Sequence, residues 1–415
     1  QVGGIGHAHL PLPARVRQHQ GTEAARLRFG QGSDDVRVEI APGATLRSVS
    51  GYEPNARSDW GLLVFGTATD PTRNATFTSG DGCGGIGAPT PSNKPTNTAF
   101  RGNDPSDGGM ANAPVPSSAR WNTDAMWVMD LDPKATGAGE QITGFYFRWS
   151  YDVAIANVLT IQNASRTSSG IGPVANATSR TVAMMFDPPN DTNYTPVVED
   201  QKLPHRVTVV NHYNILSPSG QGANQIRACR DCTFAGIYSH GGVPLRVETD
   251  GIRPVGTDCA ATGPNGVGFR EFAIVDGLRA QRIEGAYGNR VAMFTPHCLP
   301  NGTAEVTDLR GTSMGELLVV ANHQSDGPNG GFESITVRDI VGCGGSAAQD
   351  PHPDQDSYLL APSRAAVLVA PATPTLPVTL AGTLTWPSPP SAGGLIDGLL
   401  PAGHSATITH PTACP

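Results

Sequence analysis

A short apolar pattern recurs along the second half of this chain. An apolar residue is followed three positions later by another, and then by glycine or small residues. The clearest pairs are Phe234/Ile237, Ala280/Ile283, Val306/Leu309 and Val337/Ile340. Successive pairs are separated by roughly the 20–45 residues of one solenoid repeat. Short strands at this spacing predict a β-solenoid, in which each coil buries its apolar face on its neighbours.

The composition agrees with an all-β fold that is rich in turns. The chain of 415 residues contains 50 Gly and 36 Pro, and only 15% of its residues are charged. We find no long helical period, which disfavours a helical protein. A β-sandwich is the alternative, but hairpin signals are scarce, and Asn301-Gly302 is the main one. The sequence therefore favours the β-solenoid.

We predict a single domain that spans residues 1–415. Its predicted parts are an N-terminal cap (1–30), coils (31–346), and last coils with a Pro-rich C-terminal segment (347–415). Two stretches, 80–118 and 252–270, are rich in Gly, Pro and polar residues. Their length predicts long loops that wall a groove.

Charge and hydropathy limit the classes of partner. The formal net charge is −8, which gives no electrostatic basis for binding nucleic acid. No apolar stretch is long enough to cross a membrane, so we expect no membrane partner. The chain begins at Gln1 and shows no signal peptide, so we expect a mature, processed form of a secreted, extracellular protein. We also expect a monomer.

The cysteines fit a secreted protein better than a zinc protein. There are seven, an odd number, so at least one has no partner within the chain. Cys229 and Cys232 form a Cys-x-x-Cys motif, but no second pair completes a structural zinc site. One or two disulfides are expected if the protein is secreted.

One alternating strand carries candidate catalytic carboxylates. In the segment Val243–Gly251, apolar residues and Thr249 alternate with Arg246, Glu248 and Asp250. Residues two apart on a strand are separated by about 6.6 Å at Cα. Inverting glycoside hydrolases hold their two carboxyl groups about 6.5–9.5 Å apart. Taken alone, carboxylates on an exposed strand face are more often simply solvated.

Residues from neighbouring coils are predicted to join this strand in one cleft. Coils stack about 4.8 Å apart, so side chains of the same parity line up across them. The residues expected to gather are Gln225, Arg227, Arg246, Glu248, Asp250, Arg290 and His297. Arginines beside carboxylates suit an anionic polysaccharide, because guanidinium binds sulfate or carboxylate groups bidentately. Taken alone, Arg246 and Arg227 are more often structural residues that pair with neighbouring acids. His297 is equally explained as a hydrogen-bonded turn residue after Pro296.

Two short segments resemble the iota-carrageenases of glycoside hydrolase family 82. The first runs from Gly241 to Asp250 and contains Arg-Val-Glu-Thr-Asp. The second runs from Met293 to Gly302 and contains Phe-Thr-Pro-His. The resemblance covers about residues 205–345 and is strong only in these segments. It implies a right-handed parallel β-helix that hydrolyses a sulfated galactan with inversion.

The resemblance also implies roles for individual residues. Glu248 corresponds to the general acid, and Asp250 to the general base. Gln225, on the preceding coil, corresponds to a residue that helps to hold the catalytic water. His297 corresponds to a histidine that lines the site. Family members bind structural calcium, and a chloride has been associated with the site, whereas the chemistry requires no cofactor.

The chain differs from the family pattern at the insertion between the acid pair and His297. Cys259 lies inside this insertion and Cys298 lies just beyond the histidine. These two cysteines are candidates for a disulfide that clips the insertion down.

The preferred function is therefore that of a secreted, endo-acting, inverting glycoside hydrolase. Its substrate would be a sulfated or otherwise acidic galactan such as iota-carrageenan, with Arg246, Arg227 and Arg290 binding acidic substituents. A polysaccharide lyase on the same fold is one alternative. A non-catalytic β-helix, such as an adhesin or a subunit of an extracellular filament, is the other.

Overall fold

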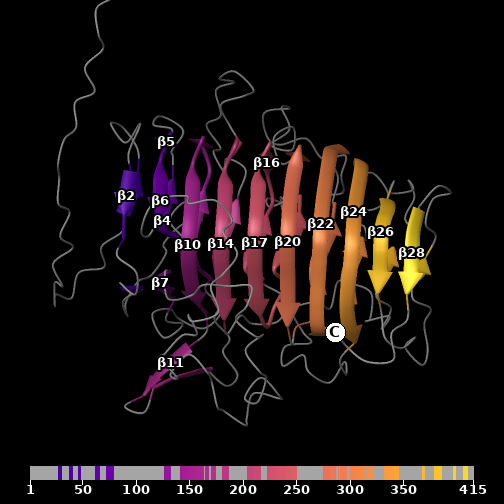
Figure 1. Cartoon of the computed structure of the whole chain (residues 1–415). Helices are drawn as coiled ribbons and strands as arrows, with labels where there is room; N and C mark the ends of the chain where they lie inside the picture. The colour runs from indigo at the N-terminus through magenta and orange to yellow at the C-terminus, as the bar shows by residue number, and fades with distance from the viewer. Residues whose placement is uncertain are drawn as a thin grey trace, which may run out of the picture.

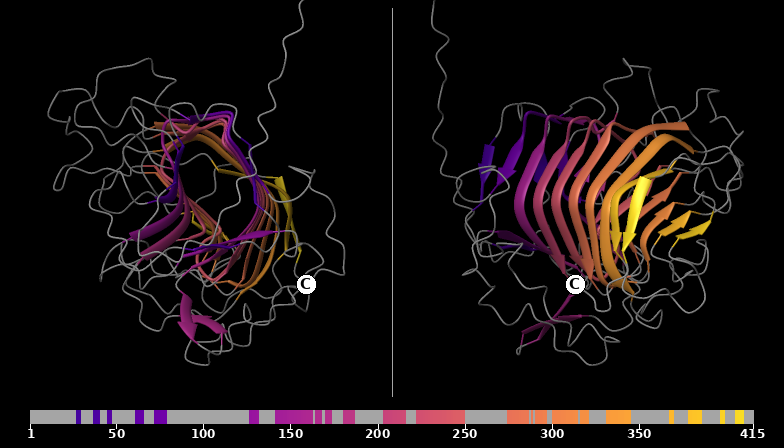
Figure 2. Two further views of the ribbon diagram at one scale, coloured as in Figure 1. Left: turned by 90° about the vertical axis from the view of Figure 1, so that its left-hand side faces the viewer. Right: turned by 45° about the vertical axis from the view of Figure 1, so that its right-hand side comes forward.

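The chain forms a right-handed parallel β-helix whose two long sheets face one another across a shared core, as the computed structural model shows (Figures 1 and 2). The structure describes residues 27–29, 37–40, 45–47, 61–65, 72–78, 126–131, 141–162, 164–167, 170–173, 180–186, 203–215, 222–249, 274–286, 288, 290–296, 300–314, 316–320, 331–344, 367–369, 378–385, 396–398 and 405–409. These described residues include strands and no helix. The predicted all-β fold is confirmed.

The first sheet has ten parallel strands, and each of them contributes one rung. In order they are β1 (Leu27–Phe29), β4 (Gly61–Phe65), β8 (Gln141–Phe147), β13 (Arg180–Phe186), β15 (Asn224–Ile226), β18 (Leu245–Glu248), β21 (Arg290–Thr295), β23 (Glu316–Val320), β25 (Val367–Val369) and β27 (Ile396–Gly398).

The second sheet has twelve strands, and the chain alternates between it and the first sheet. Its main path is β2 (Arg37–Glu39), β6 (Thr76–Thr78), β10 (Ala154–Ile161), β14 (Thr208–Ile215), β17 (Thr233–His240), β20 (Leu278–Ala286), β22 (Pro300–Met314), β24 (Gly331–Gly344), β26 (Val378–Thr385) and β28 (Ser405–Thr409). The strands β3 (Thr45–Arg47) and β7 (Trp127–Asp130) extend one side of it.

Short pairs complete the coils. Two of them are parallel: β5 (Thr72–Arg73) with β9 (Ser150–Tyr151), and β16 (Cys229–Arg230) with β19 (Val275–Asp276). An antiparallel hairpin joins β11 (Ala164–Thr167) to β12 (Gly170–Pro173).

The core consists of columns of side chains at the same register in successive coils. Phe65, Phe147 and Phe186 are in-register neighbours and are fully buried. Their rings stack at 4.8 and 4.6 Å between centroids. The column continues through Ile226 to Val247, which lies on β18. The strand with the candidate carboxylates is thus anchored by its inward face to the same core.

The repeat seen in the sequence arises from a bend in each strand of the second sheet. Phe234, Ala280, Val306 and Val337 share one register, as do Ile237, Ile283, Leu309 and Ile340. The residue just before each second member has positive φ: Gly236, Arg282, Asp308 and Asp339. This left-handed residue turns the strand (Figure 2), so both members of a pair face the core although they are three positions apart, not two.

The bend residues also contact one another from coil to coil. Asn157 and Asn211 occupy the same bend position in β10 and β14, with φ of 57° and 54°. Asn211 Nδ2 donates to Asn157 Oδ1 at 3.1 Å, and Arg282 Nη2 donates to Asn211 Oδ1 at 3.2 Å. Asparagine and aspartate tolerate this conformation better than other residues with a Cβ, which explains their frequency at the bend.

The structure refines several boundary predictions. The first strand, β1, already lies within residues 1–30, the range that was assigned to a cap. Strands of the same two sheets continue to β28, within the predicted last coils. The predicted loops 80–118 and 252–270 lie outside the described residues. Within the described ranges, no helix is long and apolar enough to cross a membrane.

A disulfide joins Cys229 and Cys232, which confirms the expectation that the chain contains at least one. Both cysteines are fully buried in the core where β16 begins a corner of the helix. Cys259 and Cys298 lie outside the described residues.

The bend makes a testable prediction at Asp339, an exposed residue with a φ of 57°. Asp339→Val should lower the free energy of unfolding by about 1–2 kcal/mol relative to Asp339→Gly, because a side chain with a Cβ is strained in the left-handed region. Both variants lose the same carboxylate, so their difference in urea denaturation isolates the backbone. Equal stability would contradict the interpretation.

Candidate active site

The site is built on β18, whose side chains alternate between the core and the outer face of the first sheet. Leu245 and Val247 belong to the apolar core. Arg246 and Glu248 occupy the other face, as the sequence predicts. Pairing with β15 places Gln225 directly beside Arg246, and pairing with β21 places Thr295 beside Glu248.

The outer face of β18 is not an ordinary solvent-exposed face. The side chain of Arg246 is only 3% exposed and that of Glu248 only 12% exposed. The alternative of a simply solvated carboxylate is therefore wrong for Glu248, and the alternative of an ion pair with a neighbouring acid holds for Arg246. Charged side chains are rarely buried unless they are paired, and here they form an ion pair.

Two donors converge on one oxygen of Glu248. Arg246 Nη2 lies 3.0 Å from Glu248 Oε2. Gln225 Nε2 donates to the same oxygen at 2.8 Å from the neighbouring coil. Both contacts fix the orientation of the carboxylate. The structure thus brings together three of the seven predicted site residues: Gln225, Arg246 and Glu248.

Gln225 is held by its amide nitrogen, and its carbonyl oxygen is left as an acceptor. The residue is 1% exposed, and its Oε1 has no hydrogen-bond partner among the residues that the structure describes. A buried polar atom without a partner is costly. Such an acceptor could receive a hydrogen bond from a water molecule or a sugar hydroxyl.

The two other predicted arginines occupy different surroundings. Arg227 follows β15 directly and is partly buried, and its backbone N–H donates to Phe186 O at 2.8 Å. Arg290 is 1% exposed and pairs with Glu316 through Nε and Oε2 at 2.9 Å. Arg290 precedes Met293, the residue opposite Arg246, by three positions, or about 10 Å along the strand.

Asp250 and His297 lie outside the described residues. The last in-register pair on β18 and β21 is Glu248 with Thr295. Asp250 and His297 each come two positions after a member of this pair in the sequence. Their assigned roles stay predictions.

The sequence did not lead us to predict a group of buried polar side chains in the interior of the β-helix, behind β15 and β18. All are fully buried: Thr160, Gln162, His212, Asn214, Asn224 and Ser239. His212 takes the place of the second apolar residue in the repeat, because it lies in register between Val158 and Ile237. The pair Val209/His212 has the spacing of the other pairs, so this interruption was visible in the sequence.

Burial keeps two histidines neutral. Desolvation lowers the pKa of His212 to about 3, although a hydrogen bond to Asn224 opposes this shift. Desolvation also lowers the pKa of His240, to about 4. His240 Nδ1 lies 3.2 Å from the hydroxyl of Tyr238, whose ring stacks on that of Tyr213 at 4.4 Å.

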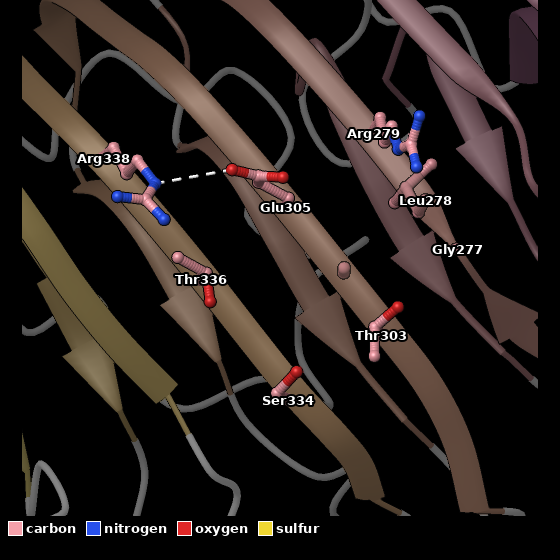
Figure 3. A pocket seen from close by; sticks show the side chains of 9 residues that line it. Gly277, Leu278, Arg279, Thr303, Glu305, Ser334, Thr336 and Arg338 are labelled. Atoms are coloured by element: carbon pink, nitrogen blue, oxygen red, sulfur yellow. Dashed lines mark ion pairs between the residues drawn. The ribbon is translucent and has the colours of Figure 1, made fainter.

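A concave surface lies on the outer face of the other sheet, over β20, β22 and β24 (Figure 3). Its volume is about 270 Å³, and its lining residues are Gly277, Leu278, Arg279, Thr303, Ala304, Glu305, Ser334, Thr336 and Arg338. Glu305 is the only carboxylate in this lining, and Arg338 pairs with it at 3.4 Å. Both side chains are 51% exposed, so this ion pair contributes little to the stability of the fold. A lining with one carboxylate lacks the acid–base pair of a hydrolase.

Comparison with known proteins supports the fold. No protein-family model matches the chain, and no curated protein matches it. Among solved structures, it is similar to a 1,3-α-1,4-β-D-galactose-4-sulfate-3,6-anhydro-D-galactose-2-sulfate 4 galactohydrolase, with 13% identity over 92% of this chain and 80% of that one, and a TM-score of 0.53. It is similar to an iota-carrageenase complexed to iota-carrageenan fragments, with 12% identity, coverage of 92% and 81%, and a TM-score of 0.53.

A third similar structure is an iota-carrageenase of family GH82 from A. fortis, determined in the absence of chloride ions. Its identity is 15%, and the TM-score is 0.44. The match covers 71% of this chain but only 45% of that protein, so the chain spans less than half of its length. At these identities, the likenesses in the preceding paragraph show a shared fold.

The buried histidines make stability depend on pH. The unfolded chain binds a proton at His212 below its ordinary pKa of 6.5, whereas the folded chain does so only near 3. Between these values, His212 should make stability fall by about 1.4 kcal/mol for each pH unit of acidification. Urea denaturation at pH 5 and pH 6 should show a smaller difference for His212→Ile than for the wild type.

Ile237→Val is the control for this prediction, because it alters the next rung of the same column without changing a titratable group. It should lower stability by about 0.5–1.5 kcal/mol at both pH values. An unchanged pH dependence in His212→Ile would contradict the prediction.

Proposed function

We propose that this protein is an inverting, endo-acting glycoside hydrolase that cleaves a sulfated galactan of the iota-carrageenan type. The observation that carries the proposal is the buried arrangement in which Gln225 and Arg246 both hold Glu248 Oε2. The parallel β-helix fold, shared with a galactohydrolase and an iota-carrageenase, supports it. So does the sequence motif that places a second carboxylate, Asp250, two residues after Glu248.

In the proposed reaction, Glu248 is the general acid and Asp250 the general base. Oε2 of Glu248 already accepts a hydrogen bond from Gln225 and pairs with Arg246, so the proposal places the transferred proton on Oε1. This proton goes to the glycosidic oxygen as the bond to the anomeric carbon breaks. Asp250 takes a proton from a water molecule, whose oxygen attacks the anomeric carbon from the opposite face.

Gln225 is proposed to orient the attacking water. Its Nε2 donates to Glu248, and its Oε1, which has no hydrogen-bond partner among the described residues, is proposed to accept a hydrogen bond from this water. His297 is proposed to line the same site. Gln225 would therefore connect the positions of acid and nucleophile through one rigid amide.

Acidic substituents of the substrate are assigned to the arginines. Arg227, which is partly buried and directly follows β15, is assigned to a sulfate ester of the substrate. Arg246 was predicted to share this role, and its buried ion pair with Glu248 favours a role in holding that carboxylate. Arg290 was predicted to share this role, and its buried ion pair with Glu316 favours a structural role. The proposal is of a secreted monomer whose chemistry requires no cofactor. The described residues include no group of three or more His, Cys, Asp or Glu side chains that could hold the structural calcium that the resemblance implies.

Substitution of the two carboxylates tests the assignment. Glu248→Gln and Asp250→Asn should each lower kcat on iota-carrageenan by about 10²–10⁴-fold, because each removes one proton-transfer group. Reducing-end release measures the rate. Glu305→Gln, a change of the same kind on the opposite sheet, should retain wild-type activity. Near wild-type hydrolysis by either carboxylate variant would overturn the proposal.

The products distinguish the proposed reaction from its alternatives. Proton NMR taken early in the reaction should show that the new reducing end has the inverted anomeric configuration. Unsaturated products that absorb in the near ultraviolet would indicate a lyase. The absence of any cleavage across carrageenans, agars and pectins would favour a non-catalytic β-helix.

A further inference from the structure

The interior of a β-helix is normally filled by apolar columns, but behind β15 and β18 it contains a hydrogen-bonded polar network. Its six side chains are each 0% exposed: Thr160, Gln162, His212, Asn214, Asn224 and Ser239. Burying polar groups costs free energy unless each finds a partner, and a network is stable only when its members are satisfied. The network therefore requires an explanation beyond filling space.

One branch of the network reaches the end of β17. Gln162 Nε2 donates to Asn214 Oδ1 at 2.9 Å, and Thr160 Oγ1 lies within hydrogen-bonding distance of the same oxygen at 2.6 Å. Asn214 Nδ2 donates to Ser239 Oγ at 2.9 Å. Ser239 Oγ in turn donates to Gly241 O at 2.6 Å. This branch thus ends on the backbone where the chain leaves β17.

The other branch reaches the start of β18. The ring of His212 lies between Thr160 Oγ1, at 2.8 Å from Nε2, and Asn224 Oδ1, at 3.2 Å from Nδ1. Because a neutral imidazole has one N–H, His212 reaches Asn224 in the tautomer protonated on Nδ1, which donates to Asn224 Oδ1 while Nε2 accepts from Thr160. The single hydroxyl proton of Thr160 then serves His212 in place of Asn214. Asn224 Nδ2 donates to Pro244 O at 2.9 Å. The two branches together hold both ends of the turn 241–244, in which Gly241 and Gly242 have φ of 76° and 67°.

This turn delivers the chain into β18, and Asn224 directly precedes Gln225. Pro244 is two positions before Arg246, so the Asn224–Pro244 hydrogen bond joins the two coils just ahead of the pair Gln225 and Arg246. On the outer face, the same two coils are joined by the 2.8 Å hydrogen bond from Gln225 to Glu248. An internal clamp and an external contact thus connect the same pair of strands.

We propose that His212 and Asn224 are positioning residues, which clamp β15 to the entry of β18 from inside the helix and so hold Gln225 against Glu248. The expected effect of these residues on kcat rests on the proposed function. Their expected effect on the distance between Gln225 and Glu248 rests on the hydrogen bonds alone. It assigns the two residues no contact with substrate.

Packing alone would be served by apolar residues at both positions. The in-register neighbours of His212 are Val158 and Ile237. Those of Asn224 are Met184 and Leu245. Since apolar columns continue on both sides, isoleucine and leucine would fit the pattern without a buried polar group. Replacement of both partners of a buried hydrogen bond by apolar residues of similar shape can be nearly neutral, whereas replacement of one leaves its partner unsatisfied at a cost of about 1–3 kcal/mol.

This context permits variants that remove the clamp and preserve the fold. Asn224→Leu should lower kcat on iota-carrageenan at least tenfold and change KM less than twofold, because a small misplacement of catalytic groups is costly in rate. Its melting temperature should stay within a few degrees of the wild type. His212→Ile is the second variant and should show the same split. Met184→Leu, in the neighbouring rung of the same column, should leave kcat unchanged.

A crystal structure of Asn224→Leu supplies a readout that does not depend on activity. The distance from Gln225 Nε2 to Glu248 Oε2, now 2.8 Å, should lengthen beyond hydrogen-bonding range. An unchanged contact in Asn224→Leu, or a kcat within twofold of the wild type in both folded variants, would overturn the clamp.

The same experiments separate this failure from that of the proposed function. If Glu248→Gln is inactive and Asn224→Leu is fully active, only the clamp is wrong. If the wild type cleaves no sulfated galactan, the proposed function is wrong, and the crystallographic distance then decides the geometric claim.

Discussion

The structure depends on parallel pairing of like positions in successive coils. Because each strand pairs in register with the equivalent strand one coil later, every inward side chain rests on its counterpart. The Phe65–Phe147–Phe186 column shows the result, and it leads through Ile226 to Val247 of the candidate site. The fold thereby holds Glu248 on a strand whose other face is locked in the core, which suits a precise arrangement of reacting groups.

The same in-register pairing repeats the bend of one strand in its neighbours, so that it becomes a bend of the sheet. A left-handed residue in one strand would be an isolated irregularity, but here Asn157, Asn211, Arg282, Asp308 and Asp339 repeat it in register. Together with Gly236 of β17, they bend the second sheet at the same position from β10 to β24. The repeated bend also explains why a polar residue or a glycine interrupts the alternation of apolar and polar residues at the same place in each of these strands.

Taken together, the paired strands β15 and β18 have polar side chains on both faces, one face toward the interior of the β-helix and the other toward its outside. On the outside, Gln225 and Arg246 are buried and both contact the mostly buried carboxylate of Glu248, so water screens the Arg246–Glu248 ion pair less than it would at the surface. On the inside, Asn224 connects the same coils. The cost of burying these groups is concentrated at one place, as is typical of sites whose geometry matters more than their contribution to stability.

The sequence by itself determined the β-solenoid class, because the spacing of pairs such as Val306/Leu309 admits few other folds. It also determined the parity of Arg246 and Glu248 and the neighbour relation of Gln225, since both follow from strand alternation and stacking. Only the tertiary structure decided that Arg246 is buried, that Arg290 pairs with Glu316, and that His212 and Asn224 join a network. These outcomes depend on which side chains contact one another across coils, and those contacts join segments that are far apart in the sequence.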